Sequence, residues 1–209
     1  MAQAAGAPGM SSRLHQTRVK PTLKAAVRAV GRALSDLPVP GMIIGGVAVI
    51  ARGVPRLTRD VDATVAGGTL DLTDLVDRLR VHELVPRIDD AIAFASANQV
   101  LLLRHAPSGV DVDLSIAWLP FEIDALAASE TLDIAGTRLR VARAEDLVIY
   151  KAIAFRPQDQ QDIERLLALY GARLDLVRIR RIVAEFSEAM EEPDRPAGLE
   201  HLLQRAGLA

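Results

Sequence analysis

The pattern of apolar and polar positions predicts a mixed sheet built mostly from residues before 142, followed by helices in the rest of the sequence. Apolar residues recur at helical spacing from Pro21 until the prolines at 38 and 40, which predicts an amphipathic helix near the N-terminus. Short apolar or alternating runs bounded by turn residues predict strands at 42–44, 60–65, 91–95, 99–104, 110–118, 131–134 and 137–141.

Helical periodicity accounts for most of the other segments. It predicts helices at 47–52, 70–79, 121–128, 145–155, 159–170, 175–190 and 199–205. We therefore expect an α+β fold, with a mixed-sheet core over residues 19–142 and a C-terminal helical region over 143–209. Residues 1–18 lack periodicity and are rich in Ala, Gly and Ser, so we expect a flexible tail. Trp118 and Phe121 are assigned to the core.

Composition narrows the possible classes of function. Half of the 209 residues are apolar and a quarter are charged, as in ordinary globular proteins. The absence of cysteine excludes disulfides, thiolate metal sites and cysteine nucleophiles. No apolar run approaches the ~20 residues of a membrane span, and the N-terminus has no continuous apolar signal-peptide region. We expect a cytoplasmic protein with no membrane partner.

The net charge of −2 hides an asymmetry along the chain. Residues 1–40 carry a formal charge of +5, and the remaining residues carry −7. Lys24, Arg28 and Arg32 recur every four residues and so form one stripe of the first predicted helix. Such a stripe is either a solvated helix face or a contact for a polyanion.

Two carboxylates at the start of a predicted buried strand raise a question of chemistry. Side chains alternate along a strand, so Asp60 and Asp62 point to the same face with their Cα atoms ~6.6 Å apart. Carboxylates this close repel each other unless a positive group lies between them, and a divalent cation is the usual one. The other reading is that both side chains are simply solvated at a strand end.

The segment VDVDLSIAW at 110–118 repeats this arrangement. Asp111 and Asp113 share a face, with the apolar residues on the other. A third carboxylate from a neighbouring strand would complete a site for two metals ~3.5–4 Å apart, which aligns attacking and leaving oxygens at phosphorus.

A glycine pair between the first strand and the next helix provides a second candidate feature. A strand, a Gly45-Gly46 turn and a helix start bring backbone N–H groups to one point where a phosphate can bind, although such a pair is often only a tight turn. Arg56 and Thr58 lie just ahead of Asp60. Arg56 can pair with a phosphate or a carboxylate, and Thr58 can donate to a phosphate oxygen.

These motifs together resemble the nucleotidyltransferases of the DNA polymerase β superfamily. Within it, the chain is most similar to the AbiEii/AbiGii toxin family, which includes the MenT toxins. The matching residues are Gly45, Gly46, Arg56, Thr58, Asp60 and Asp62. Asp113 takes the place of the third carboxylate, and Asp111 is the alternative. The resemblance implies a polymerase β-like mixed-sheet core followed by helices.

A second matching stretch is EDLVIYKAIAFRPQDQQDIERLL, residues 145–167. The family places a lysine, an arginine and aspartates where this chain has Lys151, Arg156, Asp159 and Asp162. A lysine within LVIYKAIAF is costly unless it snorkels to solvent or meets an anion. The resemblance implies that Lys151 contacts a triphosphate and that Asp159 is functional. The role of Asp162 stays open, because acids are also favoured at a helix start.

The resemblance implies transfer of a nucleoside monophosphate from a nucleoside triphosphate to an acceptor hydroxyl. The implied catalytic residues are Asp60, Asp62, Asp113, Lys151 and Asp159. The implied nucleotide-binding residues are Gly45, Gly46, Arg56, Thr58 and Lys151. Asp60, Asp62 and Asp113 would hold Mg²⁺, or Mn²⁺ in its place. The implied acceptor is the 3′ end of tRNA, which would make the protein the toxin of a type IV toxin–antitoxin system with a cognate antitoxin.

Two other functions are compatible with the same motifs. A small-molecule nucleotidyltransferase of the antibiotic-modifying kind would share every residue named above. A non-catalytic module with the same fold would bind a partner without turnover, although its carboxylates would then have no evident reason to be intact.

Overall fold

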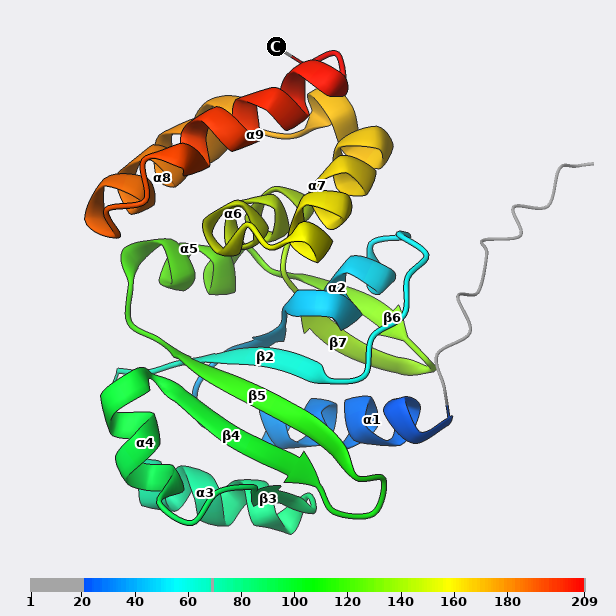
Figure 1. Cartoon of the computed structure of the whole chain (residues 1–209). Coiled ribbons are helices and arrows are strands. Elements are labelled where there is room, and N and C mark those ends of the chain that lie inside the picture. The colour runs from blue at the N-terminus through cyan, green and yellow to red at the C-terminus, as the bar shows by residue number, and fades with distance from the viewer. Residues whose placement is uncertain (1–20, 69, 209) are drawn as a thin grey trace, which may run out of the picture.

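The computed structural model describes residues 21–68 and 70–208, which form one mixed sheet with helices on both faces and further helices stacked at one end (Figure 1). This arrangement confirms the predicted fold class. The expected tail at 1–18 lies outside the described residues. No helix in the described part of the chain is long and apolar enough to cross a bilayer.

The sheet has seven strands in the order β3-β4-β5-β2-β1-β7-β6. Their bounds are β1 Gly41–Ile43, β2 Val61–Ala66, β3 Leu84–Pro86, β4 Val100–His105, β5 Val110–Ala117, β6 Glu130–Ile134 and β7 Thr137–Val141. The β2–β5 and β1–β7 pairs are parallel, and the other neighbouring strands are antiparallel. β2 and β5 are thus central strands that run side by side.

Most of the helices lie where the periodicity predicts them. Their bounds are α1 Pro21–Asp36, α2 Gly45–Ala51, α3 Leu72–Val81, α4 Ala91–Asn98, α5 Pro120–Ala128, α6 Ala144–Ala154, α7 Pro157–Tyr170, α8 Leu176–Ala189 and α9 Asp194–Arg205, with a short 3₁₀ turn at Gly171–Arg173. α9 begins earlier than expected, because Pro196 lies in its first turn, where a missing N–H costs nothing.

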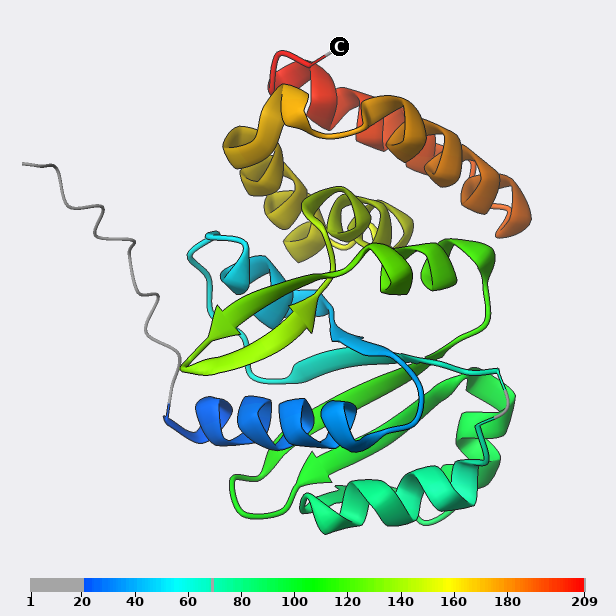
Figure 2. The same ribbon diagram turned by 180° about the vertical axis from the view of Figure 1, so that it is seen from behind.

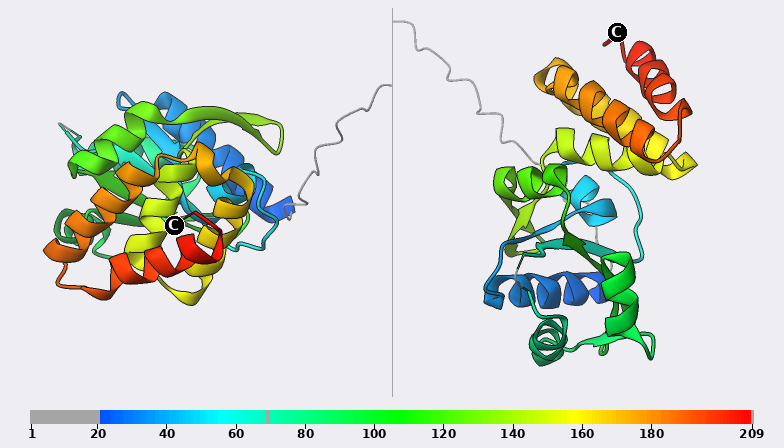
Figure 3. Two further views of the ribbon diagram at one scale, coloured as in Figure 1. Left: turned by 90° about the horizontal axis from the view of Figure 1, so that it is seen from above. Right: turned by 90° about the vertical axis from the view of Figure 1, so that its left-hand side faces the viewer.

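The helices separate into two layers across the sheet. α1 and α3 lie against one face, and α2 and α5 lie against the other (Figures 2 and 3). α6 packs on α2, α7 and α8, so the C-terminal helices stack above the α2 face. Buried Leu, Ile, Val and Ala side chains fill both layers.

Three sequence expectations were wrong. Residues 91–95 begin a helix instead of a strand, because the short apolar run AIAFASAN has no period that separates the two. This helix ends where Gln99 adopts the left-handed conformation. β3 was missed, since three residues are too short to show alternation. Trp118 is not in the core but 65% exposed, because it follows the end of β5, whereas Phe121 is buried.

Candidate active site

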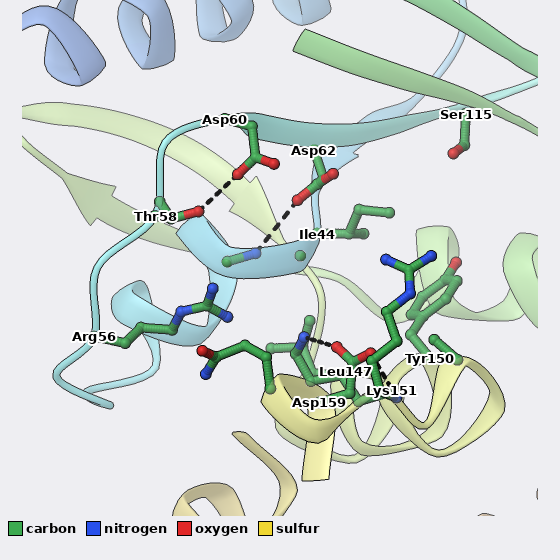
Figure 4. A pocket seen from close by; sticks show the side chains of 15 residues that line it. Ile44, Arg56, Thr58, Asp60, Asp62, Ser115, Leu147, Tyr150, Lys151 and Asp159 are labelled. Carbon is green, nitrogen blue, oxygen red and sulfur yellow. Dashed lines mark hydrogen bonds and ion pairs between the residues drawn. The ribbon is translucent and has the colours of Figure 1, made fainter. Parts of the chain in front are cut away.

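Asp60 and Asp62 enter the site from the start of β2. Asp60 immediately precedes the strand and Asp62 is its second residue. The backbone of Asp62 is fixed by a hydrogen bond from the Ile44 N–H to its carbonyl, at 3.0 Å, at the end of β1. Both carboxylates line a cleft between the sheet and the C-terminal helices (Figure 4).

The glycine pair allows the chain to approach these side chains closely. A Cβ on Gly45 would lie 1.9 Å from Oδ2 of Asp62, and one on Gly46 would lie 2.5 Å from Oγ1 of Thr58. Gly45 also has a φ of +58°, which disfavours other residues. The Gly46 N–H donates to Oδ2 of Asp62 at 3.4 Å. The turn therefore makes room for the carboxylate and gives it a backbone donor.

The surroundings of Asp62 disfavour its charged form. Burial, together with the negative charges of Asp60 and Asp113, raises the pKa of Asp62 to about 6. The Gly46 N–H and the Lys151 ammonium act in the opposite direction without cancelling the effect. This excess of negative charge is what a bound cation would relieve.

Asp60 is held by the loop that leads into β2. The Thr58 hydroxyl donates to Oδ1 of Asp60 at 2.8 Å, as Figure 4 shows. In this structure Thr58 therefore orients a carboxylate, while its predicted contact with a phosphate remains a prediction.

The opposite wall of the cleft carries cations paired with carboxylates. Lys151 on α6 is buried, and its Nζ lies 2.8 Å from Oδ1 of Asp159 and 2.9 Å from Oδ2 of Asp162, both on α7. Asp162 also accepts a hydrogen bond from the Arg56 guanidinium. Lys151 thus reaches buried anions instead of snorkelling to solvent, which resolves the alternative that its sequence context left open.

Fifteen residues line this cleft of about 290 Å³: Ile44, Gly45, Gly46, Arg56, Thr58, Asp60, Asp62, Ser115, Leu147, Tyr150, Lys151, Ala154, Arg156, Gln158 and Asp159. Sequence reasoning did not single out Ser115, Tyr150 or Gln158. Ser115 could have been found, because it lies two residues after Asp113 on the same strand face. Arg156 forms no ion pair with a carboxylate in the described part of the chain, unlike Arg56 and Lys151.

Asp113 lies next to Asp62 but faces a different partner. The two residues are directly paired in the parallel β2–β5 register. The carboxylate of Asp113 accepts a hydrogen bond from the Arg87 guanidinium at 2.6 Å, and Asp113 does not line the cleft. Asp111, two residues nearer the start of β5, is paired with Arg104. Of the two candidates for a third carboxylate, Asp113 is therefore the one beside the cleft.

The donor set fits a magnesium ion that takes part of its coordination from substrate. Within residues 21–68 and 70–208, no three His, Asp or Glu side chains converge closely enough to form a complete metal site. Mg²⁺ often takes only one or two protein carboxylates together with phosphate oxygens. Asp60 and Asp62 satisfy that requirement, and the raised pKa of Asp62 indicates an unmet demand for positive charge.

Comparison with solved structures finds the same fold in several other proteins. The antibiotic-resistance factor ANT(2″)-Ia in solution superposes with a TM-score of 0.55 at 18% identity, over 88% of this chain and 98% of that one. Its crystal structure with adenylyl-2″-tobramycin gives 0.52 at 16%, over 81% and 99%. JHP933 from Helicobacter pylori gives 0.50 at 15%, over 90% and 92%. A comparison with curated proteins found no match.

A family model identifies the class of enzyme. Residues 23–203 match the model described as a nucleotidyl transferase of unknown function (DUF2204). The match confirms that the chain is an enzyme of the nucleotidyltransferase class, whose members take a nucleoside triphosphate and generally use divalent metals. The narrower assignment to the AbiEii/AbiGii toxins remains a prediction. Because the match spans most of the sequence, this chain belongs to the nucleotidyl transferase family DUF2204.

Proposed function

We propose that this enzyme transfers a nucleoside monophosphate to an acceptor hydroxyl in the cleft between β2 and α6. The observation that carries the proposal is the meeting of two carboxylates, Asp60 and Asp62, with a wall of cations across one cleft. A metal-bound triphosphate has the charge and shape to fill the space between them.

The substrate would bind with its phosphates toward the glycine turn and the cationic wall. Arg56, Lys151 and Arg156 supply positive charge there, and Arg156 has no carboxylate partner in the described part of the chain to compete with a phosphate. Asp60 and Asp62 would hold Mg²⁺, or Mn²⁺ in its place. When bound, the ion neutralises phosphate oxygens and aligns the attacking and leaving oxygens.

Asp113 is the best-placed group to receive the acceptor proton. It lies beside Asp62 on β5, away from the cationic wall, and would exchange its Arg87 partner for the acceptor hydroxyl. The acceptor oxygen forms a bond to the α-phosphorus, the bond to the β-phosphate oxygen breaks, and pyrophosphate leaves. Asp159 holds Lys151 by a 2.8 Å contact, so its role is to orient that lysine.

We propose the 3′ end of tRNA as the acceptor, on the strength of the resemblance to the AbiEii/AbiGii toxins. The added nucleotides would block aminoacylation and arrest growth, and a cognate antitoxin would neutralise the enzyme. The helix that carries the basic stripe, α1, lies on the sheet face opposite α2 (Figure 3), and the start of α2 lines the cleft. The stripe is therefore not part of the acceptor-binding surface in this proposal.

A small-molecule acceptor is the second candidate. It is favoured by the likeness to ANT(2″)-Ia, which extends over nearly all of that enzyme's length. The carboxylates and the cationic wall would act identically on either acceptor, so only the product distinguishes the two candidates.

Mass spectrometry of products from the purified enzyme tests the acceptor. The enzyme is incubated with Mg²⁺, each of the four nucleoside triphosphates and either total tRNA or a panel of aminoglycosides. The proposal predicts tRNA heavier by whole nucleotides and unchanged aminoglycosides. Adenylylated or otherwise nucleotidylated aminoglycoside with unmodified tRNA would replace the tRNA acceptor by the second candidate.

Expression in a bacterial host tests the toxin role separately. Wild type is predicted to arrest growth, and Asp62→Ala, produced at the same level, is predicted not to. Equal growth of the two strains would remove the toxin role while leaving the transfer chemistry intact.

A further inference from the structure

Asp162 is a fully buried carboxylate that touches two of the cations of the cleft without lining the cleft itself. It is 0% exposed and lies on α7. One oxygen accepts from the Arg56 guanidinium and lies 2.9 Å from Nζ of Lys151, and the other accepts a 3.5 Å hydrogen bond from Gln158. Arg56, Lys151 and Gln158 all line the cleft.

The Asp162 carboxylate is stabilised in its buried position by the cations around it. A buried ionised carboxylate is costly unless cations and hydrogen bonds surround it. Arg56 and Lys151 come from segments that are far apart in sequence, the loop before β2 and α6, and Asp162 is the group they share. Removing it would leave two buried or half-buried cations competing for Asp159 alone.

The same helix also holds the other end of the loop that carries Arg56. Between α2 and β2, residues 52–60 contain neither helix nor strand, yet they carry Arg56, Thr58 and Asp60. The Tyr170 hydroxyl, at the end of α7, donates to the carbonyl of Arg52 at 2.9 Å. α7 therefore contacts this loop at its start through Tyr170 and at its centre through Asp162.

We infer that Asp162 is a positioning residue of the nucleotide site, through which α7 sets the place of Arg56 and Lys151. It neither binds metal nor touches the reacting atoms. The inference rests on the proposed function, since the groups it orients are those assigned to the triphosphate. It implies that the C-terminal helices complete the nucleotide site rather than merely covering it.

Kinetics of Asp162→Asn beside a matched control test this role. Asp146 is the matched control, because it is also fully buried and paired with two cations, Arg143 and Arg178, but these two arginines do not line the cleft. We expect Asp162→Asn and Asp146→Asn both to lower the melting temperature. Only Asp162→Asn should raise KM for the nucleoside triphosphate, by about tenfold or more, because misplaced binding groups lose that contact. Equal KM values in wild type and both variants would overturn the inference.

A double-mutant cycle with Arg56→Ala separates positioning from general damage. If Asp162 acts through Arg56, introducing Asp162→Asn into the Arg56→Ala variant should raise KM for the triphosphate by a smaller factor than introducing it into wild type. Full additivity would contradict the inference. If Asp162→Asn does not fold, Tyr170→Phe, which loses only one hydroxyl, replaces it as the test. A raised KM for the triphosphate in Tyr170→Phe would support the positioning of the loop by α7, and an unchanged KM would contradict it.

Binding of the triphosphate to wild type distinguishes a failure of this inference from a failure of the proposed function on which it rests. If wild type fails to bind any of the four triphosphates with Mg²⁺, the proposed function itself is wrong. If wild type binds one of them and Asp162→Asn binds it equally well, only the role of Asp162 is wrong.

Discussion

The carboxylate of Asp62 is partly buried beside two others, Asp60 and Asp113, and this crowding lowers the stability of the folded state when Asp62 is ionised. Its pKa is raised to about 6 from an ordinary value of 3.8, so the folded protein binds this proton more tightly than the unfolded chain. Folding stability must then fall as the pH rises from about 4 through about 6. Above that range, the ionised carboxylate opposes folding until a cation binds.

This cost predicts that Asp62→Asn stabilises the metal-free protein. At pH 8, with chelator present, the variant should exceed wild type in free energy of unfolding by up to about 3 kcal/mol, the equivalent of a shift of about two pKa units. Urea denaturation at several pH values measures this, and the difference should shrink as the pH falls toward 4. A variant less stable than wild type at pH 8 would show that Asp62 is not destabilised by its surroundings.

Gly45 offers a test of the close approach between the turn and the carboxylate. Gly45→Ala should abolish transfer, because the new Cβ would lie 1.9 Å from Oδ2 of Asp62. Gly109→Ala is the matched control, since Gly109 also has positive φ but a Cβ added there would have nothing within 4 Å. The control should lose about 1 kcal/mol of stability and keep its activity. Full activity in Gly45→Ala would contradict the geometry of the turn.

Arg156 should contribute to triphosphate binding because no carboxylate in the described part of the chain competes for it. We expect Arg156→Ala to raise KM for the triphosphate by about tenfold, typical of a lost charge-assisted contact. Arg165→Ala, on the exposed side of α7, is the control and should leave KM unchanged. Identical KM values in the two variants would remove Arg156 from the nucleotide site.

At the scale of the elements, the predictability of each segment depended on its length and neighbours. The alternation in VDVDLSIAW and the long helical periods after residue 144 were sufficient to predict β5 and α6 to α8. α4 was misassigned because eight apolar and small residues satisfy either a helix or a strand. β3 exists only because β4 pairs with it, and no local pattern reports such a pairing.

The candidate site was predictable where it depended on local geometry. The shared face of Asp60 and Asp62 follows from the period of a strand. In contrast, the network of Arg56, Lys151 and Asp162 joins the loop before β2 to the distant helices α6 and α7, and the pairing of Asp113 with Arg87 depends on where β3 ends. Contacts of this kind are decided by tertiary packing, which a single sequence does not display.

The position of α1 leads to a prediction about its basic stripe. If tRNA is the acceptor as proposed, the double variant Lys24→Ser, Arg32→Ser should change KM for tRNA by less than about twofold at physiological salt, because α1 covers the sheet face opposite α2. A loss of more than about tenfold, with a weaker dependence on salt than wild type, would mean that a bound tRNA extends around to the α1 face.

At the scale of the whole molecule, the sheet and the C-terminal helices provide opposite walls of one cleft. β2 and the loop before it contribute Asp60, Asp62 and Arg56, and α6 and α7 contribute Lys151 with its buried partners. The cleft thus combines both charges that a metal-bound triphosphate requires. The family match extends over residues 23–203 and so includes these helices as well as the sheet.

Transfer of radioactive phosphorus from the triphosphate shows whether this enzyme transfers a nucleoside monophosphate with the help of Asp62. Wild type and Asp62→Asn are incubated with Mg²⁺, acceptor and a triphosphate labelled at either the α- or the γ-phosphate. We expect that only the α-label enters the product and that Asp62→Asn lowers the rate by about a hundredfold or more. Incorporation of the γ-label, or equal rates in the two proteins, would contradict it.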